Sequence, residues 1–125
     1  MNHKTKTIPL KLIEVDEAIV PVVEWINGKV GAITEFSCQG SSHKSKNFIP
    51  DEGYVVFSVE GYPAIGDAVL ADILFAIDDF KSQTGLGYVR AEIEWISRRQ
   101  PFRYVMRFRD KETVVAFGEF VSKAE

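Results

Sequence analysis

A short polar segment carries the residue types that could perform nucleophilic chemistry. Ser37, Cys38, Gln39 and Gly40 end a strand-like run, and His43 follows in a polar loop. A thiol near a histidine can act as a nucleophile when the thiolate is stabilised. No spacing rule brings His43 back towards Cys38, and no third member of a triad is evident. We therefore predict that Cys38 is structural, and an enzyme centred on Ser37, Cys38 and His43 is the alternative.

A cluster of arginines offers a second kind of chemistry. The six arginines of the chain all lie within twenty residues, and four of them share one side of two strand-like segments. Guanidinium groups suit bidentate recognition of phosphate, and two nearby carboxylates, Glu92 and Glu94, cannot neutralise four of them. We expect an anionic ligand here, such as a nucleotide or an RNA segment. The candidate ligand-binding residues are Arg90, Arg103, Arg107, Arg109, Ser37, Gln39 and Gly40.

Two other interpretations of the arginines stay open. In the first, they form a ladder of surface ion pairs with Glu92 and Glu94, in which each pair contributes little stability. In the second, they belong to an open sheet face that packs against a second copy of the chain in a homodimer.

The sequence contains no recognised metal or cofactor motif. His3, His43 and one cysteine give no zinc-ligand spacing, so we expect no metal. Gly85-Leu86-Gly87 leads into a strand instead of a helix, which excludes a dinucleotide-binding loop. Backbone amides at Gly40-Ser41-Ser42 could contact an anion, although the composition there favours a flexible loop. We expect no cofactor.

One segment resembles known proteins. Trp25-Ile26-Asn27, followed by Thr34-Glu35-Phe36-Ser37-Cys38-Gln39-Gly40, is similar to a pattern in small phage and bacterial proteins without assigned function. It more distantly resembles the Ser-Cys-Ser-Gly stretch of the tRNA methyltransferases of wybutosine synthesis, which implies a nucleic-acid-modifying enzyme as the alternative function. In those longer enzymes an arginine follows the glycine, whereas Ser41 follows Gly40 here, so their substrate and cofactor are not carried over.

Local patterns predict the elements of the first half of the chain. Residues 8–13 are typical of a short strand, and residues 18–26 predict a helix because two acidic residues precede them and an Asn-Gly pair follows. Residues 32–38 and 53–60 are rich in β-branched and aromatic residues, which predicts two strands. The polar residues 39–52 between them predict a mobile loop.

The second half of the chain has clearer periodicity. Gly61-Tyr62-Pro63 opens a segment in which apolar side chains recur at three- and four-residue steps from Ile65 to Phe80, which predicts a long helix ended by Gly85. Residues 111–123, preceded by the N-cap residue Asp110, predict a terminal helix. The aspartates of the long helix are expected to be solvated surface.

A hairpin is expected between these two helices. Residues 89–95 and 102–108 alternate apolar with charged side chains, so each strand has one apolar and one charged face. A turn at 98–101 would place Trp95 opposite Tyr104 and Glu92 opposite Arg107.

The expected element order is β-α-β-β-α-β-β-α. This order predicts an α+β fold with an antiparallel sheet, helices on one face and a ferredoxin-like core. A chain of 125 residues fits one domain, residues 1–125. The helix-strand-strand unit occurs twice, without a repeat at the residue level.

Composition limits the classes of function. The net charge of −3 gives no general support for polyanion binding, and no apolar run approaches the ~20 residues that span a bilayer. A single cysteine and the absence of a signal-like segment favour a reducing cytoplasm. The leading hypothesis is a non-enzymatic, homodimeric protein that binds a phosphate-bearing small molecule or RNA, with a protein-interaction module as a further alternative.

Overall fold

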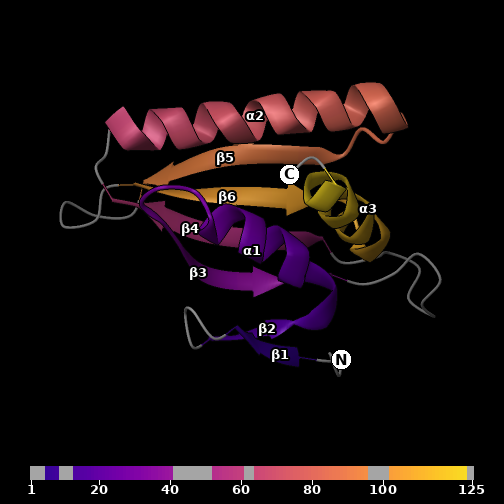
Figure 1. The fold of residues 1–125 in the computed structure, drawn as a ribbon, viewed down its shortest axis with the longest axis horizontal. Helices are drawn as coiled ribbons and strands as arrows, with labels where there is room; N and C mark the ends of the chain where they lie inside the picture. The colour runs from indigo at the N-terminus through magenta and orange to yellow at the C-terminus, as the bar shows by residue number, and fades with distance from the viewer. Residues whose placement is uncertain (1–4, 9–12, 41–51, 61–63, 96–101, 124–125) are drawn as a thin grey trace.

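The computed structural model describes residues 5–8, 13–40, 52–60, 64–95 and 102–123 (Figure 1). The expected α+β fold with an antiparallel sheet is confirmed. The elements in chain order are β1 (Thr5–Ile8), β2 (Ile13–Asp16), a 3-10 turn (Glu17–Ile19), α1 (Val20–Asn27), β3 (Ala32–Cys38), β4 (Gly53–Val59), α2 (Ala64–Thr84), β5 (Val89–Trp95), β6 (Phe102–Phe108) and α3 (Lys111–Lys123).

The four strands of the main sheet lie in the order β3-β4-β6-β5, and all neighbours are antiparallel. The units α1-β3-β4 and α2-β5-β6 therefore each contribute one hairpin, and the two hairpins join through their second strands. The repeated helix-strand-strand unit expected from the sequence is thus the unit from which the sheet is built.

The N-terminal region differs from expectation. The predicted single strand at 8–13 is instead two paired strands, because Ile8 ends β1 and Ile13 begins β2, and residues 9–12 lie outside the described part. These strands form a separate two-stranded sheet. The predicted order therefore gains one strand. The predicted ferredoxin-like core is not confirmed, since the first strand of the chain takes no part in the main sheet.

All three described helices contribute to one core on one side of the main sheet. In Figure 1, α1 and α3 lie in front of the sheet and α2 runs along its β5 edge. Alternate residues of the strands pack against the helices, and both the sheet and the helices contribute apolar side chains to the core. Its largest fully buried side chains include Phe57, Tyr104 and Phe108 from the strands and Ile73, Phe80 and Phe117 from the helices.

Local signals in the sequence set the ends of the helices. Pro21 lies within the first turn of α1, where its missing N–H costs no helical hydrogen bond. Gly85 follows α2 with φ of 72°, a left-handed conformation that glycine adopts without strain. Asp110 accepts a 2.8 Å hydrogen bond at Oδ1 from the Thr113 N–H and thereby caps α3 as expected.

The register of the β5–β6 hairpin is shifted by two residues from the prediction. Trp95 pairs with Phe102 and Glu92 pairs with Val105, whereas the prediction placed Tyr104 and Arg107 opposite them. The connection spans residues 96–101 and is longer than the turn that was assumed, and these residues lie outside the described part. A shift of two keeps each side chain on its predicted face, because side chains alternate with a period of two.

No helix in the described part of the chain is long and apolar enough to cross a membrane.

Candidate binding face

The side of the main sheet that faces away from the helices is called here the open face. Cross-strand partners share a face, so the register assigns its residues in rows. One row contains Cys38, Tyr54, Arg107 and Arg90, and the next contains Phe36, Val56, Val105 and Glu92. Arg103 and Glu94 pair beyond the second row, on β6 and β5.

The arginines of the open face are matched by carboxylates. Arg90 Nε lies 2.9 Å from Glu92 Oε1, and Arg103 Nε lies 3.2 Å from Glu94 Oε2. Arg107 is the centre of the network, since its Nε is 3.3 Å from Glu92 Oε2 and its Nη2 is 3.6 Å from Glu94 Oε1.

A third carboxylate joins this network from the start of β4. Glu52 Oε2 lies 3.9 Å from Arg107 Nη1, and Glu52 Oε1 accepts a 3.2 Å hydrogen bond from the Tyr88 hydroxyl. The six residues Arg90, Arg103, Arg107, Glu52, Glu92 and Glu94 are called the ladder below. The ladder has no net charge, because three carboxylates face three guanidinium groups.

The fourth candidate arginine has a partner outside the ladder. Arg109 Nε lies 3.3 Å from Oδ2 of Asp110, the buried N-cap of α3. Its guanidinium therefore contacts the carboxylate that also holds the start of that helix.

The ladder covers an apolar residue in the middle of the sheet. Val105 is only 2% exposed although the described helices lie on the other side. It stands between Arg103 and Arg107 on β6 and opposite Glu92 on β5. Long side chains such as these can cover an apolar neighbour with their aliphatic stems, and Val56 of β4 lies beside Val105 on the other side.

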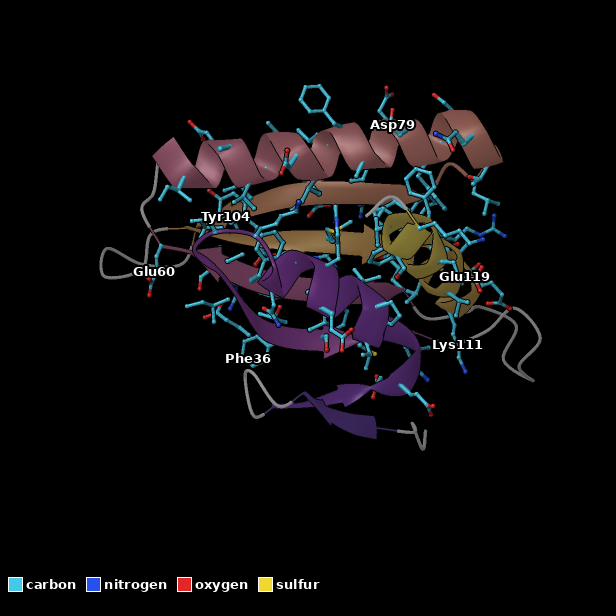
Figure 2. All side chains as sticks on the ribbon, in the orientation of Figure 1. Phe36, Glu60, Asp79, Tyr104, Lys111 and Glu119 are labelled. Atoms are coloured by element: carbon cyan, nitrogen blue, oxygen red, sulfur yellow. The ribbon has the colours of Figure 1, made fainter. Side chains whose placement is uncertain are left out.

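The exposed apolar side chains of the open face lie on β3, at the opposite edge of the sheet from the ladder. Phe36 is 59% exposed on β3, the edge strand farthest from β5 (Figure 2). Ile33 on the same strand is also exposed, and Phe36 pairs with the buried Val56. The open face is thus apolar along β3 and charged but neutral along β5 and β6.

The segment with a candidate nucleophile does not gather its residues at one point. Ser37 pairs with Val55 of the core, whereas Cys38 pairs with Tyr54 of the open face. The hydroxyl and the thiol therefore lie on opposite sides of the sheet. His43 and most of the predicted loop 39–52 lie outside the described residues.

Gln39 and Gly40 are part of the framework of the fold. The side-chain Oε1 of Gln39 accepts a 3.1 Å hydrogen bond from the Ala18 N–H, and its own N–H donates to Asp16 Oδ2 over 3.1 Å. Gly40 is buried with φ of 75°. Gln39 therefore connects the end of β3 to the turn before α1.

The sequence prediction missed Glu52, Tyr88, Ile33 and Phe36 as parts of this surface. The alternation of β4 extended back by one step places Glu52 on the side of Tyr54, so that signal was present in the sequence. The exposure of Phe36 depends instead on a register shift between Thr34 and Phe36. Its residue type does not reveal this irregularity.

No cluster of three or more histidine, cysteine, aspartate or glutamate side chains that could hold a metal ion occurs among the described residues. No protein-family model, curated protein or solved structure matches this chain.

Proposed function

We propose that this chain is a non-enzymatic protein-binding module that pairs with a second copy of itself through the open face. The observation that carries the proposal is the combination on one sheet surface of exposed Phe36 and a neutral ladder of both charge signs. Exposed aromatics with arginine and a polar rim are typical of protein interfaces.

Charge favours a second copy over a phosphate-bearing ligand. Each ladder arginine already has a carboxylate within 4.0 Å, so a nucleotide or RNA would have to displace those carboxylates. A surface with equal numbers of both signs is not repelled by its own copy. Anion binding, the leading expectation from sequence, thus becomes the second candidate.

A two-fold axis across the strands would bring the open face of one copy onto the open face of a second copy. Such an axis stacks β3 on β3 and β5 on β5 of the partner in opposite directions. The row of Phe36 and Val105 then meets itself, while the two flanking rows exchange places. Arg90 then lies over Glu94 of the partner subunit, whereas Arg107 lies over the partner's Arg103 and Glu92 over the partner's Glu92, so this pairing combines an attractive contact with like-charge contacts.

The size of the sheet limits the strength of this pairing. Four strands of seven residues, at about 4.8 Å between strands and about 3.3 Å per residue, cover about 440 Å². Stable interfaces bury about 800 Å² on each partner. We therefore expect a dimer that forms and dissociates with concentration.

The enzyme alternative has less support. Ser37 and Cys38 face opposite sides of the sheet, so they cannot act on the same atom. Among the described residues, neither side chain has a hydrogen-bonded base.

Sedimentation velocity over a range of concentrations tests the proposal. Phe36→Asp should give a monomer at concentrations where the unmodified chain dimerises, because it places a charge in the apolar row. Phe75→Asp is the matched control, since Phe75 is 70% exposed on α2, outside the open face, and this variant should dimerise normally. A monomeric unmodified chain, or equal dissociation of both variants, would overturn the proposal.

Anion binding is measured on the same proteins with ATP and single-stranded RNA at several salt concentrations. If the unmodified chain binds either probe, and Arg103→Gln/Arg107→Gln loses that binding with a shallower salt dependence, the open face is an anion site. That result would replace the self-association proposal.

A further inference from the structure

A groove lies between α1 and α2 on the helical side of the molecule, away from the open face. It has a volume of about 640 Å³. Its walls are the end of α1 with the following turn and the first half of α2, and Val30 at its edge is 76% exposed. The described lining residues are Trp25, Gly28, Lys29, Val30, Ile65, Ala68, Val69 and Asp72.

One side chain of the chain itself shows what the groove accommodates. The Lys29 ammonium lies 4.4 Å from the centre of the Trp25 ring and 3.3 Å from Asp72 Oδ2. The Lys29 side chain is only 14% exposed, so its aliphatic stem is largely covered. An aromatic face, apolar walls and a carboxylate at the edge are suited to a basic side chain with an apolar stem.

Helix α2, which forms one wall of the groove, is acidic. Its exposed residues include Asp67, Asp72, Asp78 and Asp79 but one lysine, Lys81. Of these, Asp72 lines the groove, where it pairs with Lys29. Within the described part, Asp67, Asp78 and Asp79 make no ion pair, and Figure 2 marks Asp79 on α2. This acidic helix favours a basic occupant of the adjoining groove and disfavours a second copy bound through α2.

The shape of the groove fits a helix. The wall from Ile65 to Asp72 spans eight residues of α2, or about 12 Å, which matches two turns of a helix laid alongside. An added helix would continue the layer that α1, α2 and α3 form over the sheet.

From these contacts we propose that the groove between α1 and α2 binds an amphipathic helix of a partner protein, whose apolar residues lie towards Trp25, Val30 and Ile65 and whose lysine or arginine residues replace Lys29 beside Asp72. This site is separate from the open face, so it stands independently of the homodimer.

A fluorescently labelled amphipathic helix of about 18 leucine and lysine residues serves as the probe. Its binding is measured by fluorescence anisotropy, and the indole N–H signal of Trp25, identified by its loss in Trp25→Phe, reports contact with the groove. We expect saturable binding and a shifted Trp25 signal. A peptide of the same spacing with glutamate in place of lysine should not bind.

Two variants of exposed alanines on α2 test the location. Ala68→Trp fills the groove and should weaken binding by about tenfold or more, whereas Ala71→Trp, an alanine that does not line the groove, should change it by less than about twofold. Both variants should retain the circular dichroism of the unmodified chain and its self-association, which separates this result from failure of the homodimer.

Several outcomes would overturn this proposal. Equal binding by Ala68→Trp and Ala71→Trp would show nonspecific attraction to an acidic protein, and equal binding of the glutamate peptide would remove the role of charge. An unmoved Trp25 signal would place the peptide elsewhere. A Trp25 signal that shifts with protein concentration alone would make a second copy the occupant.

Discussion

Asn27 connects the end of α1 to the middle of β3. Its Oδ1 accepts two hydrogen bonds from Thr34, one from the backbone N–H at 3.0 Å and one from the hydroxyl at 2.8 Å. Thr34 is buried and lies on β3, an edge strand of the main sheet, where an N–H that points away from β4 has no partner strand. The side-chain amide of Asn27 therefore provides an acceptor for the Thr34 N–H, which has no hydrogen-bond partner in the sheet.

Asn27→Ala should lower the free energy of unfolding by about 1–3 kcal/mol, because two donors of buried Thr34 lose their acceptor. Urea denaturation followed by tryptophan fluorescence measures this change. Glu24→Gln, an exposed substitution on the same helix, is the control and should stay within about 0.5 kcal/mol. An equally small effect for Asn27→Ala would mean that the two hydrogen bonds contribute little net stability.

The sequence could predict which side of a strand a residue of the candidate site occupies. It could not predict contacts with residues that are distant in the chain. The arginine face was predicted from the alternation of the strands alone, and Arg90, Arg103 and Arg107 lie on the side of the sheet where that alternation placed them. Arg109 follows the end of β6 and contacts Asp110 instead. Gln39, however, contacts Ala18, 21 residues earlier in the chain, and no local pattern indicates that contact. The neutrality of the ladder likewise depends on Glu52, which belongs to a different hairpin from Arg107.

At the scale of elements, the prediction was reliable where a segment has strong periodicity. It failed at positions where the chain reverses direction. Helix α2 was predicted from its apolar repeat because one face had to be buried along 21 residues. The β1–β2 hairpin was missed because an alternating pattern is the same whether a strand continues or turns back. The predicted β5–β6 register was wrong by two residues because the alternating pattern does not fix the position of the turn.

Gly53 at the start of β4 shows how closely elements approach. A Cβ atom there would lie 2.5 Å from Val114 Cγ2 of α3 and 3.0 Å from the Gln39 carbonyl oxygen. Even the smallest side chain would therefore force the Val114 side chain, or α3 that carries it, to shift. Gly87, before β5, has nothing within 4 Å of its Cβ position.

Gly53→Ala should destabilise the fold by about 1–3 kcal/mol through overpacking. Gly87→Ala is the matched control and should be neutral or stabilising by up to about 1 kcal/mol, because it restricts only the unfolded chain. Thermal unfolding by circular dichroism compares the two variants. Equal melting temperatures would show that the Val114 side chain or α3 can shift to admit a Cβ atom at no cost.

At the scale of the whole molecule, one ring joins the layers. Phe117 on α3 is fully buried, and its ring centre lies 5.5 Å from that of Trp25 on α1, 5.2 Å from Phe80 on α2 and 5.6 Å from Phe108 on β6. Every described helix and the main sheet thus meet at a single side chain. The helices should therefore unfold together with the sheet instead of separately.

Phe117→Ala should destabilise the molecule by about 3–5 kcal/mol, since it leaves a cavity among three aromatic rings. This is a large part of the roughly 5–15 kcal/mol that holds such a domain folded, so Phe117→Leu is measured as well and should lose less. Phe75→Ala removes the same atoms from an exposed position and should change stability by less than about 0.5 kcal/mol. In each variant, urea transitions followed by far-ultraviolet circular dichroism and by tryptophan fluorescence should coincide. Separate transitions in Phe117→Leu would show that the helices are held by more than one core.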